Sequence, residues 1–237
     1  MVYGDIHGCF EEFLQLRQKI GIQKGDIEIS VGDFLNKGPY SIKVLQFLRK
    51  NSILAVRGNH EDKFIRYHFH QILHPKKNPM RLDTLEEQIY AQLSDEDIRY
   101  LQTLPLFIQK KKLTVVHAGV LPQTKLENLD KKMAAKIMRV RYVDDEGHFV
   151  PLDKVDIQRH FWWSDLYDGR YGFIVYGHQP FYAPRLDRFS IGIDTGGVYG
   201  NKLTAAIFGE CIAQMEIVQV ASKAYAQRRR PWIVADL

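Results

Sequence analysis

Short apolar runs rich in β-branched and aromatic residues recur along the chain, and each ends in a cluster of Gly, Asp, His or Asn. These runs cover residues 27–31, 53–56, 113–116, 173–176 and 189–193. Apolar runs of this length, bounded by turn residues, predict buried strands. Helical patterns lie between the early runs at 10–20 and 41–50, the second with Ile42, Leu45 and Leu48 on one face. This alternation predicts an α/β fold whose functional residues lie at the carboxyl ends of strands.

The remaining pattern predicts one domain over residues 1–237 with two insertions. Residues 61–104 are expected to be helical, with Ser94 as the N-cap of a helix that has an acidic first turn. Residues 121–160 have weak periodicity and mixed charge, which predicts a loop-rich insertion over the site. Only Met1, Val2 and Tyr3 precede Gly4-Asp5, so either the first strand is very short or the natural chain begins further upstream.

Composition narrows the class of protein. Apolar residues make up 45% of the chain and charged residues 26%, which excludes disorder as the main state. No apolar stretch is long enough to span a membrane, and the first residues lack a signal-peptide pattern. The only two cysteines, Cys9 and Cys211, suit a reducing compartment, so we expect a cytoplasmic protein that acts without a membrane.

The net charge of +5 favours an anionic partner without identifying it. Nucleic acid is not expected, because the basic residues form no stripe with interleaved aromatic residues. Arg228, Arg229 and Arg230 are interpreted as a solvated basic end. Nothing in the pattern indicates an oligomer.

Five short motifs couple glycines to residues that can bind a divalent metal. They begin at Gly4 (GDIHG), Gly32 (GDFLNKGP), Arg57 (RGNHE), His117 (HAG) and Gly177 (GH). Glycine lets the backbone turn sharply at a sheet edge and directs the adjacent side chain into a common cleft. Asp5 and His7 are two residues apart and can chelate one ion, whereas the two carboxylate oxygens of Asp33 can bridge two ions.

The donor set then indicates the chemistry. Asn59 adds an amide oxygen, and His117 and His178 add imidazole nitrogens. Mixed nitrogen and oxygen ligands suit Mn, Fe, Zn, Ni or Co rather than Ca. Two such ions, with manganese favoured, can hold a bridging hydroxide and stabilise an in-line displacement at phosphorus. His60, next to Asn59, is then positioned to protonate the leaving oxygen as a general acid.

On these motifs the chain resembles the calcineurin-like metallophosphoesterases, in particular the phosphoprotein-phosphatase-type superfamily and its symmetrical dinucleoside tetraphosphatase branch. The resemblance extends from Val2 to about Phe208. It implies a β-sandwich of two sheets flanked by helices, with a dinuclear centre at the strand ends. It further implies that Asp5, His7 and Asp33 bind one ion. The residues implied for the second ion are Asp33, Asn59, His117 and His178.

Two residues depart from the family pattern. Asn36 and Lys37 stand where the second motif usually has Asp and Arg. The family's Asp orients the general-acid histidine, so Asn36 is expected to orient His60 while raising its basicity less. Lys37 keeps the positive charge of the Arg but lacks its bidentate fork.

Further basic residues are candidates for substrate binding. Arg141, in an Arg-x-Arg-aromatic segment like that of the tetraphosphatase branch, is expected to reach the phosphate, with Arg139 as the alternative. Arg57 either helps to hold the phosphate or forms an ion pair at the sheet edge.

Several tempting residues are assigned ordinary roles. Asp194 is expected to cap a turn, Cys9 to be a packed thiol, and His68, His70 and His74 to lie on a solvated helix face. Trp162, Trp163 and Tyr199 are interpreted as core or cleft walls, any one of which could stack a nucleobase.

The sequence therefore predicts a metal-dependent phosphoesterase whose preferred substrate is a dinucleoside tetraphosphate, split symmetrically. The first alternative is a protein phosphatase acting on phosphoserine, phosphothreonine or phosphotyrosine with the same site, because RGNHE is closer to that branch. The second alternative is a non-catalytic phosphate-binding module, suggested by Asn36, Lys37 and the short first strand.

Overall fold

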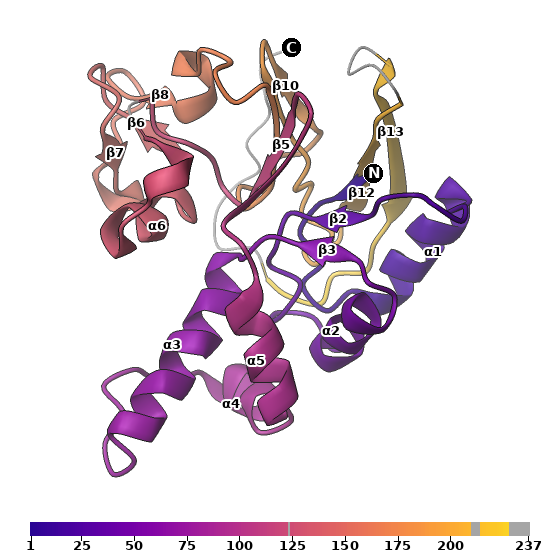
Figure 1. Ribbon diagram of the computed structural model, residues 1–237, viewed down its shortest axis with the longest axis vertical. Helices are drawn as coiled ribbons and strands as arrows, with labels where there is room; N and C mark the ends of the chain where they lie inside the picture. The colour runs from indigo at the N-terminus through magenta and orange to yellow at the C-terminus, as the bar shows by residue number, and fades with distance from the viewer. Residues whose placement is uncertain (123, 210–213, 228–237) are drawn as a thin grey trace.

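The structure, a computed structural model, describes residues 1–122, 124–209 and 214–227 (Figure 1). One five-stranded sheet has the order β13-β12-β1-β2-β3. Strands β1, β2 and β3 are parallel, β12 pairs antiparallel with β1, and β13 pairs antiparallel with β12. The bounds are β1 Val2–Tyr3, β2 Ile29–Ser30, β3 Leu54–Ala55, β12 Lys202–Ile207 and β13 Glu216–Ala221.

The second five-stranded sheet has the order β10-β11-β9-β5-β4. Its central strands β11, β9 and β5 are parallel, and β10 and β4 form antiparallel edges. The bounds are β4 Phe107–Lys110, β5 Leu113–Val116, β9 Phe173–Tyr176, β10 Arg185–Asp187 and β11 Ser190–Gly192. Strands β5 and β9 match the predicted runs residue for residue.

The two sheets pack face to face around a core of aliphatic side chains. Val2, Ile29 and Ala206 come from the first sheet, and Val115 and Val175 come from the second. β-Branched residues on facing pleated surfaces interdigitate well, which explains why these short runs form buried strands. The predicted two-sheet sandwich is confirmed.

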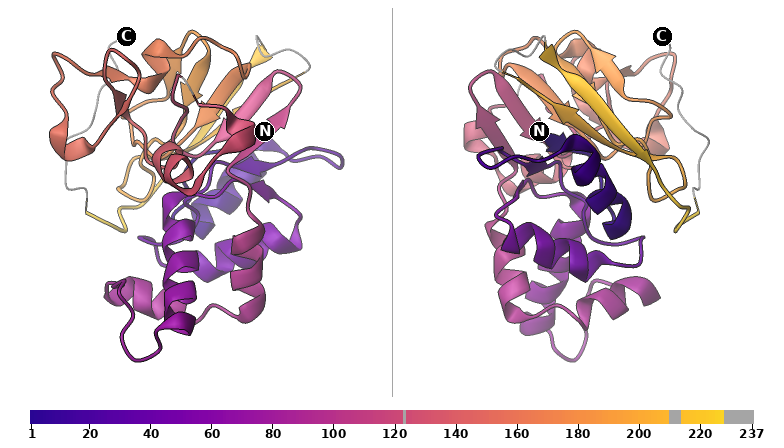
Figure 2. Two further views of the ribbon diagram at one scale, coloured as in Figure 1. Left: turned by 60° about the vertical axis from the view of Figure 1, so that its left-hand side comes forward. Right: turned by 90° about the vertical axis from the view of Figure 1, so that its right-hand side faces the viewer.

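Helices cover the outer face of the first sheet. α1 (Phe10–Ile20) and α2 (Ser41–Lys50) have the predicted bounds and bury one apolar face each. The predicted helical insertion contains α3 (Asn59–Leu73), α4 (Thr84–Tyr90) and α5 (Asp95–Thr103), which extend together away from the sheets (Figures 1 and 2). The Ser94 hydroxyl accepts a hydrogen bond from the Asp97 N–H, which confirms the predicted N-cap of α5.

The segment predicted to be loop-rich contains more regular structure than its pattern indicates. Helix α6 (Lys131–Ile137) packs with a third sheet in the order β7-β6-β8, beside the second sheet and away from α1 (Figure 1). Its strands are β6 Tyr142–Val143, β7 Phe149–Val150 and β8 Phe161–Trp162. Strands of two residues are too short to produce a detectable alternation, which is why the pattern did not reveal them.

The first strand, β1, has only two residues, and β2 and β3 are shorter than the apolar runs that contain them. Residues Val31 and Val56 remain buried after their strands end, because the backbone already turns toward the site. No helix in the described part of the chain is long and apolar enough to cross a membrane. Cys211 and Arg228–Arg230 lie outside the described residues.

Candidate metal centre

A cavity of about 990 Å³ opens at the carboxyl ends of the strands. Its floor includes Asp33, Asn59, His60 and His178. The helical insertion lines one part of it through Asp83, Leu85 and Glu86, whereas the 121–160 insertion contributes Arg141, Tyr142, Leu152, Val155 and Ile157. Both insertions therefore line the cavity whose floor the strand ends provide.

Five strands deliver the predicted metal ligands to this floor. Asp5 and His7 follow β1, Asp33 follows β2, and Asn59 begins α3 directly after β3. His117 follows β5 in the second sheet, and His178 follows β9. Because parallel strands of each sheet end at the same edge, residues separated by more than 170 positions meet here.

The backbone at the floor is held in unusual conformations. Among the described residues, seven non-glycine residues have a positive φ, and five of these belong to the site. They are His7 (43°), Asp33 (47°), Asn36 (71°), Lys37 (65°) and His178 (69°). Left-handed backbone is unfavourable for residues with a side chain, and its concentration at one place is typical of functional sites.

The motif glycines let the backbone approach the carboxylates closely. A Cβ atom at Gly177 would lie 2.0 Å from Asp5 Oδ1, and one at Gly58 would lie 2.2 Å from Asp33 Oδ1. Instead, the N–H of His178 donates to Asp5, and the N–H of His60 donates to Asp33. Close packing therefore requires the two glycines, and neither of them has a positive φ.

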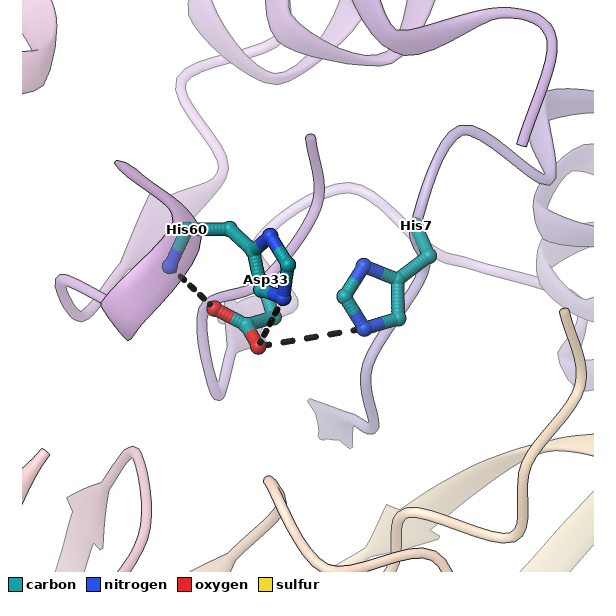
Figure 3. Close-up of side chains that lie close together, drawn as sticks. All are labelled: His7, Asp33 and His60. Atoms are coloured by element: carbon teal, nitrogen blue, oxygen red, sulfur yellow. Dashed lines mark hydrogen bonds and ion pairs between the residues drawn. The ribbon is translucent and has the colours of Figure 1, made fainter. Parts of the chain in front are cut away.

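Asp33 is the centre of the ligand cluster. Its Oδ2 lies 3.8 Å from His7 Nε2, 3.8 Å from His60 Nε2 and 3.4 Å from His117 Nε2. Figure 3 shows the His7 and His60 rings beside this carboxylate. Two ligand groups share it, His7–Asp33–His60 and Asp33–His117–His178, and within each group the candidate ligand atoms lie within 4.8 Å of one another.

The second group has its nitrogens arranged for a cation. His117 Nδ1 lies 2.8 Å from the Val31 carbonyl oxygen, so it donates there and leaves the Nε2 lone pair free in the neutral ring. That Nε2 faces two further acceptors, Asn59 Oδ1 at 3.1 Å and Asp33 Oδ2 at 3.4 Å. Three acceptors facing one another require a proton or a metal ion between them. Burial lowers the pKa of His117, but the Asp33 carboxylate raises it, and the net shift is upward.

His178 adds an independent observation. Its Nε2 is buried and has no hydrogen-bond partner among the described residues. Burial, and then the charge of Arg141, lowers the pKa of His178 well below its usual range, so the ring is neutral and one of its two nitrogens has a free lone pair. An unpartnered nitrogen of a neutral imidazole beside a carboxylate cluster is a suitable ligand for a transition metal.

The first group fits a cation as well. His7 Nδ1 donates a hydrogen bond to the Leu35 carbonyl oxygen at 2.9 Å. The lone pair of the neutral ring is then on Nε2, which lies 3.8 Å from Asp5 Oδ2. Burial, followed by the charges of Asp194 and Asp33, raises the pKa of Asp5 well above its usual range. Buried carboxylates that repel one another are stabilised by positive charge. The residues present therefore fit the two divalent ions that the sequence predicts.

His60 and Asn36 are brought together as predicted. Asn36 Nδ2 lies 2.9 Å from His60 Nδ1 and 3.1 Å from Glu86 Oε1, while the amide oxygen of Asn36 accepts the Lys37 N–H at 2.8 Å. Because Glu86 can only accept, the amide group donates on this side and His60 Nδ1 accepts. The proton of the neutral ring then lies on Nε2, on the side of Asp33. Burial lowers the pKa of His60 to about 4.

The structure distinguishes between the predicted basic residues. Lys37 lines the cavity, and its ammonium group lies 2.6 Å from His7 Nε2 and 5.3 Å from the centre of the Tyr199 ring. Arg141 also lines the cavity, where its Nε donates to Gln179 Oε1 at 2.5 Å. Arg139 does not line it and forms an ion pair of 3.7 Å with Asp62.

Arg57 lies apart from these residues. It is not among the cavity-lining residues, and its guanidinium donates to the carbonyl oxygens of Gln102 and Leu104. This placement favours the structural alternative at the sheet edge over a phosphate contact, although the partners are carbonyl groups rather than an acid.

Two buried glutamates support the site, and sequence reasoning gave neither of them a role. Glu61, fully buried, accepts the N–H groups of Asp33, Leu35 and Gly58 at 2.8 to 3.1 Å and thereby joins two motifs. Glu86 contacts both Asn36 and Lys63. The acidic ending of RGNHE was a local signal for Glu61, whereas Glu86 acts on a residue 50 positions away.

The other predicted roles can be compared with the structure. Asp194 accepts the Gly196 N–H at 2.9 Å and caps that turn, and burial raises the pKa of Cys9 to about 12, as expected for a packed thiol. His68 bonds the Tyr90 hydroxyl, and His70 stacks on His74; none of the three belongs to a metal-ligand group among the described residues. Trp163 is buried, whereas Tyr199 lines the cavity.

Comparison with known proteins agrees with this geometry. The sequence profile of the calcineurin-like phosphoesterases matches residues 1–209. Proteins named bis(5'-nucleosyl)-tetraphosphatase PrpE [asymmetrical] are similar over almost their whole length. The protein of Oceanobacillus iheyensis is 33% identical, covering 94% of this chain and 92% of its own, and that of Bacillus subtilis is 31% identical, covering 93% of each.

Solved structures show the same fold. A protein described as a candidate diadenosine tetraphosphatase superimposes with a TM-score of 0.75 at 24% identity, covering 94% of this chain and 92% of its own. A protein serine/threonine phosphatase of Saccharomyces cerevisiae gives a TM-score of 0.59 at 16% identity, covering 96% of this chain and 80% of its own.

A two-sheet sandwich with a carboxylate–histidine cluster at its strand ends defines a metal-dependent phosphoesterase. The chain belongs to the calcineurin-like phosphoesterase family and is a hydrolase of phosphate esters or anhydrides. The name of the bacterial relatives specifies asymmetrical cleavage, so it does not match the symmetrical branch that the motifs predict.

Proposed function

We propose that the protein hydrolyses dinucleoside tetraphosphates asymmetrically, to a nucleoside triphosphate and a nucleoside monophosphate, at a centre of two divalent ions. The observation that carries the chemistry is the convergence of two ligand groups on Asp33 at the floor of a 990 Å³ cavity. That volume is at the upper end of the roughly 300–1,000 Å³ of small-molecule sites. The relatives' name supports the substrate and the position of cleavage.

The ligands would be divided as the motifs indicate. Asp5 and His7 would hold one ion, His117, His178 and Asn59 would hold the other, and Asp33 would contribute to both. Divalent ions bound there polarise phosphoryl oxygens and activate water for in-line attack. Manganese remains the predicted metal, with Fe, Zn, Ni and Co as alternatives, and a cytoplasmic location remains the prediction from cysteine usage.

The chain's own cations bind and orient the polyphosphate. Lys37 and Arg141 line the cavity on different elements, the first in the loop after β2 and the second directly before β6. Their charges neutralise phosphate oxygens that do not contact a metal ion. Arg141, whose Nε donates to Gln179, lines the cavity with a planar guanidinium of the kind that binds phosphate.

His60 would donate a hydrogen bond from Nε2 to the leaving oxygen, and in its imidazolium form it would transfer the Nε2 proton to that oxygen. In the ring orientation fixed by Asn36, this nitrogen carries the proton of the neutral imidazole and lies 3.8 Å from Asp33 Oδ2. A leaving nucleotide oxygen beside Asp33 would therefore meet the Nε2–H group, and transfer from the imidazolium would leave the neutral ring.

The test is a chromatographic analysis of diadenosine tetraphosphate digested in the presence of Mn²⁺. Equal amounts of ATP and AMP support the proposal, whereas ADP as the sole product would establish symmetrical cleavage. Failure to cleave this substrate together with hydrolysis of phosphopeptides would favour the protein-phosphatase alternative.

A further inference from the structure

One wall of the cavity is apolar, and the phosphoester chemistry does not use it. It is formed by Leu152, Val155 and Ile157, which we call the apolar ledge. Leu152 belongs to a short 3-10 helix (Leu152–Lys154) that directly follows β7, and the other two residues continue that segment. Ile157 is 80% exposed, the largest exposed fraction among the large hydrophobic residues that the structure describes.

The aliphatic residues of this segment line the cavity, and its acidic residues do not. Leu152, Val155 and Ile157 line it, whereas the charged neighbours Asp153 and Asp156 do not. A surface segment that presents three aliphatic side chains to a cavity and its charges elsewhere has an amphipathic arrangement. Exposed aliphatic groups are unfavourable in water, so such a face is explained by a ligand with an apolar surface.

The ledge lies beside a phosphate-binding residue. Tyr142 pairs with Val150 across the β6–β7 hairpin; Arg141 precedes this pair, Leu152 follows it, and both residues line the cavity. Directly paired residues of antiparallel strands are about 5 Å apart, so the chain segments that carry Arg141 and the ledge are neighbours. The cavity thus combines a cationic, metal-binding floor with an adjacent apolar surface.

We propose that the apolar ledge binds a nucleobase of the substrate by its flat face while Arg141 holds an adjacent phosphate. This inference rests on the proposed function, because a nucleoside polyphosphate has both an anionic chain and a flat apolar base. The three ledge side chains offer no hydrogen-bonding group, so recognition there is by contact area and tolerates different bases.

The matched ligands for the test are ATP and inorganic tripolyphosphate, which carry the same phosphate chain with and without a nucleoside. Each is measured as a competitive inhibitor of Mn²⁺-dependent para-nitrophenyl phosphate hydrolysis. This readout does not require that the protein cleave a dinucleoside tetraphosphate, so it can succeed or fail independently of the proposed function.

The variant is Val155→Ser combined with Ile157→Ser. We expect the inhibition constant of ATP to rise about tenfold and that of tripolyphosphate to change less than about twofold. The KM for diadenosine tetraphosphate should rise with that of ATP while kcat is retained. Leu186→Ser is the control, because Leu186 is 64% exposed and does not line the cavity.

Two results would overturn the proposal that the ledge binds a nucleobase. One is an ATP inhibition constant that the double variant leaves unchanged. The other is a parallel loss for tripolyphosphate, which would indicate general damage to the site. If the unmodified protein leaves diadenosine tetraphosphate intact while the ATP effect is present, the proposed function fails and the nucleobase site stands.

Discussion

The two ligand groups that share Asp33 differ in how their charge is balanced. In the first, the Lys37 ammonium group lies 2.6 Å from His7 Nε2. In the second, His117 Nε2 faces the oxygens of Asn59 and Asp33, and His178 Nε2 has no hydrogen-bond partner among the described residues. In the first ligand group, the Lys37 side chain supplies positive charge. In the second ligand group, the charge would come from a bound metal ion.

This difference indicates that the two metal positions are not equivalent. An ammonium group at hydrogen-bonding distance from a ligand nitrogen competes with a metal ion for that lone pair and repels the ion. Burial lowers the pKa of Lys37, but Tyr199 and Asp33 raise it, and the net upward shift keeps the group charged. We therefore expect the second position to bind metal more tightly than the first.

The largest effect is expected for the residue common to both groups. Asp33→Asn removes the bridging carboxylate, so bound manganese and Mn²⁺-dependent para-nitrophenyl phosphate hydrolysis should both fall, the latter about a thousandfold or more. Metal analysis and rate measurements check this, with Asp168→Asn on the surface as the matched control. If Asp33→Asn kept full activity, the hydrolysis would not come from this site. That result would support the non-catalytic alternative.

His60 tests the composition of the first group. Its Nε2 is as far from Asp33 Oδ2 as that of His7, at 3.8 Å, so geometry allows it to be a ligand or a proton donor. As a donor, His60→Ala should lower kcat about a hundredfold or more and leave the metal content unchanged. His7→Ala is the comparison, because it should lose one ion per chain. Loss of metal and turnover in parallel would make His60 a ligand or a structural residue.

Substitutions of Lys37 test whether the two metal positions differ in affinity. Lys37→Met, which removes the charge and keeps the stem, should raise the Mn²⁺ affinity of the weaker position about tenfold or more in calorimetric titration. It should also weaken inhibition by inorganic phosphate. Lys37→Arg should preserve or improve phosphate affinity, because it restores a bidentate cation. A large loss of phosphate affinity in Lys37→Arg would show that Lys37 serves another purpose.

The smallest effect concerns the proton on His60. Asn36→Asp alone would place a second carboxylate against that of Glu86. We therefore combine it with Glu86→Gln, so that the amide and the carboxylate of this hydrogen-bonded pair exchange places. The carboxylate then accepts a hydrogen bond from the Nδ1–H group and should raise the pKa of His60, now about 4, by about one unit or more. The imidazolium would then persist to higher pH in an NMR titration of metal-free protein. An unchanged pKa would mean that Asn36 does not control the ring.

The convergence of the candidate ligands was predictable because each lies in a motif that follows a strand. The pattern placed α1, α2, β5 and β9 correctly, and parallel strand ends meet at one edge by geometry alone. The third sheet was missed because its strands have two residues each. Its stability comes from packing, such as the stacking of Tyr142 on Trp162 at 4.3 Å, which no local pattern encodes.

The supporting groups show a second limit of sequence reasoning. Glu86 contacts Asn36 across 50 positions, and Arg57 turns toward carbonyl groups of Gln102 and Leu104 rather than toward the cavity. A motif identifies which residue can perform a task. The direction of a long side chain depends on which acceptors the tertiary structure places within its reach.

The candidate metal ligands span residues 5 to 178, and this separation has a consequence for how the protein would acquire its metal ions. Ligands so far apart come together only when both sheets have formed, since closing such long loops is entropically costly before the strands pair. A metal ion therefore cannot template folding here as it does in a zinc finger, whose ligands are close in sequence. Metal loading is expected to be the last step of assembly, and the folded protein, stripped by a chelator, should regain its ions without being unfolded.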